Sequence, residues 1–262
     1  MINKKILLIT LTVIVGLLSG CSASDGAVKD IDKQIKCMAD NVAQIFPDED
    51  NIYAVTVTDY DQNGLLEIVF SNNNNSGNYT YSYMYEMKSD LSGLEEVKYG
   101  QVDEDEYTQP DIIVNEAKVF KDDKGYHYVF DDLTRSGYVW LHCAKQVFTK
   151  KDNSISVDTL GHLTAANNEE SENEFIVEIY DANDNIINIG DYRKLDSEKL
   201  SDSEELKLTM NWEYVEDASE LSVDMLRKLF DEFKLTEEKA SESAYFDPEV
   251  YFDVNEINIV YR

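Results

Sequence analysis

The sequence predicts an α+β fold, mainly antiparallel β-sheet with a helix near each end of the mature chain, which we take to begin at residue 21. Two amphipathic segments predict the helices, and alternating segments joined by short turns predict the sheet. Parallel strands need long crossover connections, so the short turns favour antiparallel pairing. The 262 residues are 43% apolar and include 17 tyrosines, a globular composition despite a net charge of −30.

Helical periodicity marks the two helices. In residues 28–45, apolar side chains recur at steps of three and four, at Val28, Ile31, Ile35, Met38, Val42 and Ile45. Pro47 closes this pattern. The second helix is expected within residues 219–233, where Ser222 is a suitable N-cap and Asp224 suits the positive end of the helix dipole.

Alternating patterns predict the strands between these helices. Hairpins are expected over residues 53–71, 117–130, 137–165 and 174–192. Their turns are expected within residues 59–67, at 122–125, near 151–153 and around 181–185. The last segment, residues 245–262, is expected to be extended and to add to a sheet.

The first twenty residues are typical of an export signal. Lys4 and Lys5 form a short basic region, and the mostly apolar residues 6–18 follow it. A membrane-spanning helix needs about 20 apolar residues, so this run is short for a permanent span. Leu-Ser-Gly-Cys at residues 18–21 resembles the lipobox of bacterial lipoproteins, which implies cleavage before Cys21 and a diacylglyceryl group on its sulfur. The alternative is an ordinary signal peptide followed by a chance cysteine.

The lipobox resemblance implies a protein held by its N-terminal lipid on the outer face of the cytoplasmic membrane, since two acyl chains anchor stably. Residues 1–20 are then the signal peptide, residues 21–27 the lipidated cysteine and a short spacer, and residues 28–262 a single globular α+β domain. The 53 acidic residues against 23 basic ones repel nucleic acid, which is not expected as a partner. A cell-wall glycan or an envelope protein remains as the expected partner.

The stretch DYDQNGLLE, residues 59–67, predicts a calcium loop in which Gly64 permits the tight turn. The expected ligands are oxygen-bearing groups at successive odd positions: Asp59, Asp61, Asn63, the carbonyl of Leu65, and Glu67. Ca²⁺ takes hard oxygen ligands of this kind. An EF-hand is excluded because the flanking segments have the pattern of strands. The alternative is a plain hairpin turn, because Asn-Gly is a strong turn signal and aspartates cap turns without any ion.

A second turn in the chain provides a comparison. Residues 181–189 have Asp181, Asn183 and Asn185 at the same first three positions. Isoleucines stand where the first loop has its glycine and its closing glutamate. We therefore expect this second turn to form without metal.

A tyrosine-rich segment follows the first loop. Tyr79, Tyr81, Tyr83 and Tyr85 alternate along one expected strand and therefore share a face. That face is either a platform on which sugar rings stack or a face packed on the core, since tyrosine is a strong strand former. The loop and this segment, roughly residues 53–96, resemble uncharacterised lipoproteins of low-GC Gram-positive bacteria, and that resemblance implies no activity.

Common enzyme signatures are missing from the sequence. It contains no nucleophile elbow, no H-E-x-x-H, no P-loop and no dinucleotide fingerprint. His127, His142 and His162 lie in expected strands without the spacing of metal ligands. Cys37 and Cys143 are expected either as free thiols or as a disulfide.

The expected function is therefore that of a lipid-anchored, non-enzymatic surface protein that binds a ligand in the cell envelope. Two alternatives stay open. One is an envelope hydrolase that acts on glycan or peptide through acidic residues without a recognisable motif. The other is a regulatory lipoprotein that scaffolds another protein at the membrane.

Overall fold

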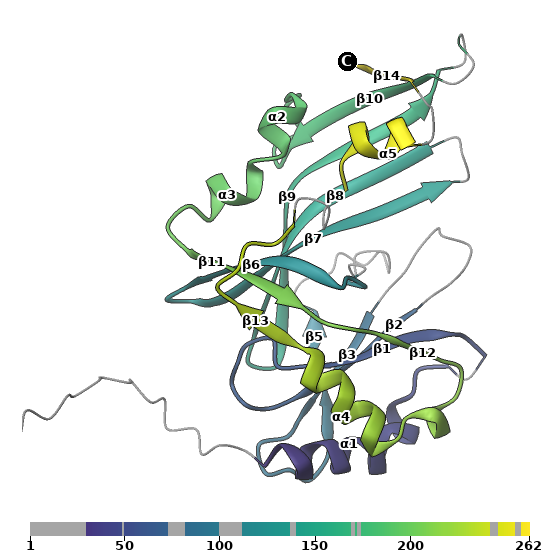
Figure 1. The fold of residues 1–262 in the computed structure, drawn as a ribbon, viewed down its shortest axis with the longest axis vertical. Coiled ribbons are helices and arrows are strands. Elements are labelled where there is room, and N and C mark those ends of the chain that lie inside the picture. The colour runs from purple at the N-terminus through teal and green to yellow at the C-terminus, as the bar shows by residue number, and fades with distance from the viewer. Residues whose placement is uncertain are drawn as a thin grey trace, which may run out of the picture.

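The computed structural model describes residues 30–48, 50–72, 82–99, 112–136, 140–168, 171, 174–241, 246–254 and 258–262. It confirms the α+β class, with two mostly antiparallel sheets, a helix near the N-terminus and short helices near the C-terminus (Figure 1). The expectations for Cys21, Tyr79 and Tyr81 lie outside the described residues.

The first sheet has five antiparallel strands in the order β12-β1-β2-β3-β4. Their bounds are β1 Tyr53–Thr58, β2 Glu67–Asn72, β3 Ser82–Met87, β4 Leu94–Glu96 and β12 Glu213–Val215. The expected hairpin around the 59–67 loop is confirmed, with Thr58 directly opposite Glu67.

The second sheet has nine strands, in the order β13-β11-β6-β7-β8-β9-β10-β14 with β5 added beside β9. Their bounds are β5 Lys98–Tyr99, β6 Glu116–Asp122, β7 Gly125–Ser136, β8 Trp140–Lys151, β9 Ser154–Asn167, β10 Glu174–Asp181, β11 Glu204–Thr209, β13 Lys234–Thr236 and β14 Asn258–Tyr261. The pairs β10–β14 and β5–β9 are parallel, and the others are antiparallel. The hairpins β6–β7 and β8–β9 turn at the expected residues.

Side-chain caps open α1, α2, η1 and α4. Their bounds are α1 Ile31–Ile45, α2 Ile189–Tyr192, α3 Leu195–Lys199, the 3₁₀ helix η1 Ala218–Glu220, α4 Val223–Glu232 and α5 Pro248–Val254. Asp30 accepts the Lys33 N–H at the start of α1. Ser222 accepts the Met225 N–H at the start of α4, as expected.

The hairpin expected over residues 174–192 is only partly formed. After the turn, Tyr180 and Ile186 make a single bridge, and the chain then enters α2 rather than a second strand. The amide side chain of Asn188 explains the change, because its oxygen accepts the Asp191 N–H and caps α2.

The extended structure expected over residues 245–262 is also partly wrong. Residues Pro248–Val254 form helix α5, and only Asn258–Tyr261 adds a strand, parallel to β10. The Asp247 carboxylate accepts the Glu249 N–H at 2.9 Å, and Pro248 opens the first turn, where its missing N–H costs nothing.

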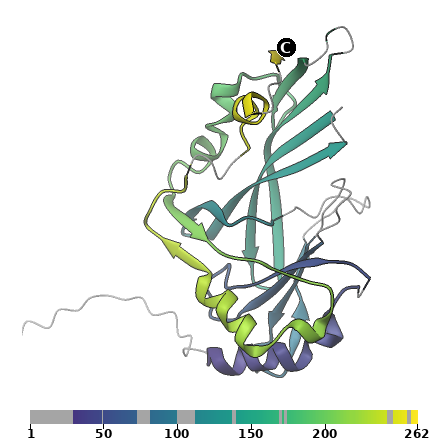
Figure 2. The ribbon, with the colours of Figure 1, turned by 45° about the vertical axis from the view of Figure 1, so that its right-hand side comes forward.

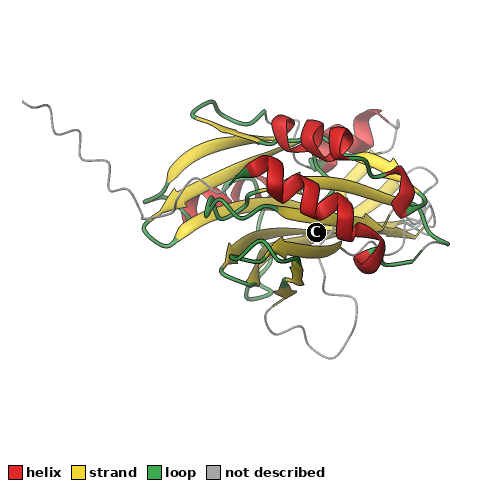
Figure 3. Cartoon of the chain, turned by 90° about the horizontal axis from the view of Figure 1, so that it is seen from below, coloured by secondary structure: helices red, strands yellow, loops and turns green. Residues whose placement is uncertain are grey.

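The first sheet lies between a helical layer and the lower part of the second sheet (Figures 1 and 2). The view from below in Figure 3 shows helices lying across strands. Buried side chains of α1 and α4, among them Met38 and Leu226, pack against Val55 and Phe70 on one face of the first sheet. The opposite face shares a core with the second sheet, described next.

The core between the sheets is what positions the 59–67 loop. Tyr60, Val69 and Met84 from the first sheet and its loop pack in one buried cluster with Tyr128 and Phe148 of the second sheet. Strand β8 carries Phe148 on this side, so the side chain two residues further along β8 faces the same way. A third cluster fills the space between the upper strands of the second sheet and helices α2 and α5.

Candidate metal centre

The 59–67 loop is a tight turn held by hydrogen bonds from its backbone N–H groups. Gly64 has φ = 78°, in the left-handed region that glycine adopts without strain, as the sequence predicted. The Gly64 N–H donates to Asp59 Oδ2 at 3.2 Å, and the Gln62 N–H donates to the Asp59 carbonyl at 3.2 Å. Asp59 therefore closes the loop on itself.

Helix α1 fixes this loop through one buried amide. Gln34 is fully buried, its Nε2 donates to the Gly64 carbonyl at 2.9 Å, and its Oε1 accepts the Leu66 N–H at 2.9 Å. Both polar ends of the amide are satisfied by loop backbone, which holds the loop against the helix. A glutamine on a helix carries no sequence signal for such a role.

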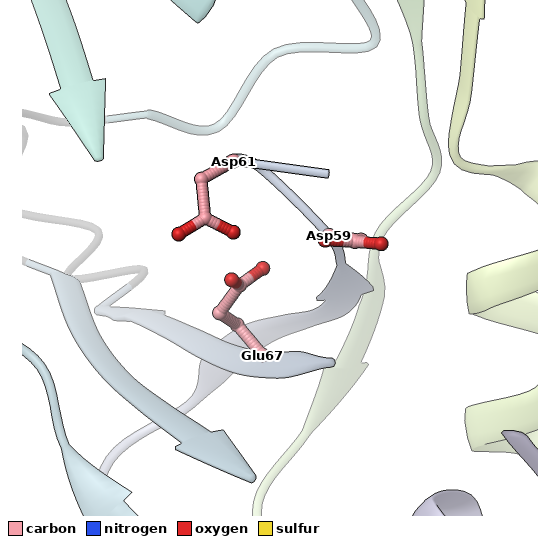
Figure 4. Close-up of side chains that lie close together, drawn as sticks. All are labelled: Asp59, Asp61 and Glu67. Carbon is pink, nitrogen blue, oxygen red and sulfur yellow. The ribbon is translucent and has the colours of Figure 1, made fainter. Parts of the chain in front are cut away.

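Three carboxylates converge at the loop, and we call Asp59, Asp61 and Glu67 the acidic triad (Figure 4). Their ligand oxygens lie within 4.8 Å of one another. Figure 4 shows the carboxylates of Asp61 and Glu67 directed toward one another. An all-oxygen group of this kind suits a hard divalent cation, so the triad is a candidate metal-binding group.

Glu67 is the most buried member of the triad. Its Oε2 accepts hydrogen bonds from Thr58 Oγ1 at 2.8 Å and from the Tyr60 N–H at 3.0 Å. Its Oε1 accepts no hydrogen bond from the described residues and makes only an ionic contact of 3.1 Å with Lys150 Nζ. The contact with Lys150 therefore offsets only part of the cost of burying Glu67 Oε1 away from water.

Lys150 reaches the triad from β8 of the second sheet. Its fully buried Nζ lies 2.6 Å from Glu86 Oε1, 2.9 Å from Asp61 Oδ2 and 3.1 Å from Glu67 Oε1. Burial by itself lowers the pKa of Lys150, but the neighbouring carboxylates, Glu67 first, outweigh it and raise the pKa above its ordinary value. The ammonium is therefore charged, and it is a cation already built into the site.

The position of Glu86 explains why a cation is needed here. Glu67 on β2 and Glu86 on β3 are directly opposite each other in register, and both are buried. Like charges directly opposite on a sheet destabilise it. The Lys150 ammonium contacts both carboxylates and offsets their repulsion.

The single ammonium of Lys150 does not neutralise the four carboxylates near it, which belong to Asp59, Asp61, Glu67 and Glu86. Burial raises the pKa of Glu67 to about 8. Burial, together with the charge of Asp61, raises the pKa of Asp59 to about 6. Because the pKa values of both carboxyl groups are raised, the site favours added positive charge, either as protons or as a metal ion.

The structure brings together the three predicted carboxylate ligands, Asp59, Asp61 and Glu67. Asn63 presents its amide nitrogen, which donates to Asp61 Oδ2 and to Glu86 Oε1 at 3.0 Å each. Its oxygen instead accepts the Leu65 N–H at 2.6 Å. Asn63 therefore serves the site as a donor to the acids, and the Leu65 carbonyl stays a predicted ligand.

The second turn has none of this convergence. Asp181 Oδ1 accepts the N–H groups of Asn183 at 2.8 Å and Asn185 at 3.0 Å. The side-chain amide of Asn185 also donates to this carboxylate, and its hydrogen bonds first, followed by those of the two N–H groups, lower the pKa of Asp181. Among the described residues, the acidic triad alone forms a group of three or more candidate metal ligands.

The two described tyrosines of the expected platform lie on β3. Tyr83 and Tyr85 are half-buried and pack against the cluster formed by α1, α4 and the first sheet. The Tyr85 ring lies edge-on to Phe70, with 6.4 Å between the ring centroids. These contacts favour the core-packing interpretation for this pair.

Histidines and cysteines lie away from the triad. His127 contacts Thr149 and Asp122. His142 stacks on Trp140 and His162 on Tyr180, and the two histidine rings are tilted against each other with 5.5 Å between their centroids. The sulfurs of the described cysteines, Cys37 and Cys143, are both free thiols.

Comparison with known proteins finds no matching family model, curated protein or solved structure. Within the described part of the chain, no helix is both long enough and apolar enough to cross a bilayer.

Proposed function

We propose that the chain is a lipid-anchored, non-enzymatic protein of the cell envelope whose folded part binds calcium at the 59–67 loop. The observation that carries the calcium proposal is the convergence of the acidic triad, which Lys150 neutralises only in part. The anchoring proposal is supported by the lipobox-like residues that end at Cys21.

The donor set fits calcium. Asp59, Asp61 and Glu67 offer only carboxylate oxygens, and Ca²⁺ tolerates the irregular geometry of a loop better than Mg²⁺ does. Lys150 competes with the ion for the carboxylates of Asp61 and Glu67. We therefore place the affinity in the weak, extracellular range of about 10⁻⁴–10⁻³ M.

The first prediction compares the two turns of the chain. At about 1 mM calcium, such an affinity stabilises the fold by about 0.4–1.4 kcal/mol, which raises the melting temperature by a few degrees at most. Wild type and the variants Asp61→Asn and Asp181→Asn are melted with calcium and with chelator. Calcium is expected to raise the melting temperature of wild type and of Asp181→Asn but not of Asp61→Asn.

The Asp181 variant is the matched control, because it makes the same chemical change in a turn that lacks converging acids. An equal response of all three proteins would place the ion elsewhere. If wild type shows no response up to about 10 mM calcium, well above the expected affinity, the calcium proposal fails.

The second prediction concerns the anchor. Cys21→Ala removes the sulfur that the lipid modifies, so the protein is expected to leave the membrane fraction or to accumulate as an unprocessed precursor. Fractionation of cells, with the size of the product read on a gel, measures both results. A variant that is processed normally and stays in the membrane fraction would show that the lipoprotein proposal is wrong.

A further inference from the structure

Two histidines lie side by side on strands β8 and β9 of the second sheet. In the register of these strands, Ala144 is opposite His162 and His142 is opposite Thr164, so the two histidines are diagonal neighbours on one face. Leu141, next to His142 in the sequence, is buried in the cluster with α2 and α5, the helices that lie beside these strands in Figures 1 and 2. Neighbours on a strand point to opposite faces, so the histidines lie on the face turned away from those helices.

The distance between the two imidazoles is that of a pair of ligands that share a metal ion. The ring centroids of His142 and His162 lie 5.5 Å apart, and the ring planes are inclined by 32°. Two imidazoles that bind one tetrahedral ion through bonds of about 2.0–2.1 Å have ring centroids roughly 5 Å apart. Rotation about the side-chain torsions, without movement of the strands, therefore brings a nitrogen of each ring to one ion.

Aromatic side chains occupy the outer faces of both rings. The Trp140 ring stacks on His142 with 5.9 Å between the centroids, and the Tyr180 ring stacks on His162 with 4.9 Å between the centroids. Stacked rings meet through their faces, whereas the nitrogens of an imidazole lie at its edge. The stacking therefore supports the two rings and leaves their nitrogens accessible to a ligand.

The nitrogens of these two histidines are not used by the protein. Within the described part of the chain, the imidazoles of His142 and His162 make no hydrogen bond or ion pair, and both residues are half-buried. His127 differs, because its Nδ1 lies 2.8 Å from Thr149 Oγ1 and its Nε2 lies 3.1 Å from Asp122 Oδ1. An imidazole binds a metal through an unprotonated ring nitrogen, so the pair on β8 and β9 has ligand atoms available that His127 has not.

A carboxylate lies on the same face as the pair. Glu178 of β10 is opposite Thr164, in the row of the sheet that contains His142. Its Oε2 accepts the Tyr180 hydroxyl at 3.0 Å. This negative charge favours a cation, and imidazole nitrogens suit zinc, copper or nickel, whereas Ca²⁺ takes oxygen ligands.

We propose that His142 and His162 together bind a divalent transition metal ion of the zinc type, with water completing its coordination. Lys150, which contacts the acidic triad, lies near the other end of β8. The site therefore goes beyond the proposed calcium function and does not depend on it.

The test is a calorimetric titration of the full chain with Zn²⁺, in about 10 mM calcium so that oxygen sites of the expected affinity are filled. Wild type is expected to bind one Zn²⁺ per chain saturably. His142→Gln and His162→Gln each remove one of the two protein ligands, and both are expected to bind Zn²⁺ at least about tenfold more weakly.

Two control variants locate the ion. His127→Gln makes the same change on β7, where both nitrogens already have partners, and is expected to bind Zn²⁺ like wild type. Asp61→Asn is also expected to bind it like wild type. A loss of affinity in Asp61→Asn that matches the loss in the His142 and His162 variants would place the ion at the acidic triad and overturn the proposal.

A second measurement uses wild type alone, so that it does not depend on the folding of a variant. Diethyl pyrocarbonate acylates accessible imidazole nitrogens, and mass spectrometry of peptides identifies the modified histidines. Zn²⁺ is expected to protect His142 and His162 and to leave the modification of His127 unchanged. Unprotected His142 and His162 at saturating Zn²⁺ would overturn the proposal, as would the absence of saturable binding up to about 1 mM Zn²⁺.

Discussion

Replacement of Lys150 by methionine is expected to lower the free energy of unfolding by about 3–5 kcal/mol in calcium-free buffer, because it removes one partner of a buried charge group. Methionine keeps most of the length and the apolar stem of the lysine side chain, so the substitution removes mainly the ammonium group. Glu67 and Glu86 are then left opposite each other with no cation between them. Urea unfolding in the presence of chelator measures the change.

Calcium is expected to restore much of this loss. The ammonium competes for two members of the triad, so its removal frees those carboxylates for the ion. The stabilisation by calcium is therefore larger in Lys150→Met than in wild type. In chelator, ionisation of Glu67 and Asp59 becomes more costly still, since a nearby positive charge is what favours their ionised forms.

The neighbouring Lys151 provides the control. It is exposed at the end of β8, where Lys151→Met is expected to change stability by no more than about 0.5 kcal/mol. If Lys150→Met is as stable as Lys151→Met, the buried ammonium contributes nothing. If it is destabilised and calcium does not help, the triad does not take the ion.

The local part of the site was predictable from the sequence, and the distant part was not. Alternating oxygen side chains and an Asn-Gly pair predict the turn and the convergence of Asp59, Asp61 and Glu67 because they lie within one hairpin. Lys150 is 89 positions from Asp61, and spacing says nothing about such a pair. The one available signal was strand alternation, which puts Lys150 on the same face as the buried Phe148.

In the fold, the long helices were predictable from the sequence and the short ones were not. Helices α1 and α4 span several turns, so their apolar stripes repeat often enough to be recognised. Helices α2 and α3 have four and five residues, too few to show a period. Helix α5 begins in the sequence Asp-Pro, a start signal that the alternation of aromatic and acidic residues around it obscured.

Tyr60 couples the 59–67 loop to the core between the sheets. Tyr60 stands between Asp59 and Asp61 in the sequence, and its side chain is fully buried. Its ring centroid lies 4.8 Å from that of Tyr128, 5.3 Å from Phe148 and 5.7 Å from Phe233. The Tyr60 carbonyl also accepts a hydrogen bond of 2.6 Å from the Tyr128 hydroxyl. A loop built only for metal binding does not require a ring buried this deeply.

Tyr60→Ala is therefore expected to lower the free energy of unfolding by about 3–5 kcal/mol, as large-to-small aromatic changes do in cores. Among the described residues, Tyr60→Phe loses only the contact of the hydroxyl with Met210 Sδ at 3.8 Å, and it is expected to cost no more than about 1 kcal/mol. Urea unfolding of both variants measures the difference. Because the bond from Tyr60 to Glu67 comes from the backbone N–H, both variants are expected to keep the calcium response that Asp61→Asn loses. A Tyr60→Ala protein as stable as Tyr60→Phe would show that the two sheets do not depend on this ring for their packing.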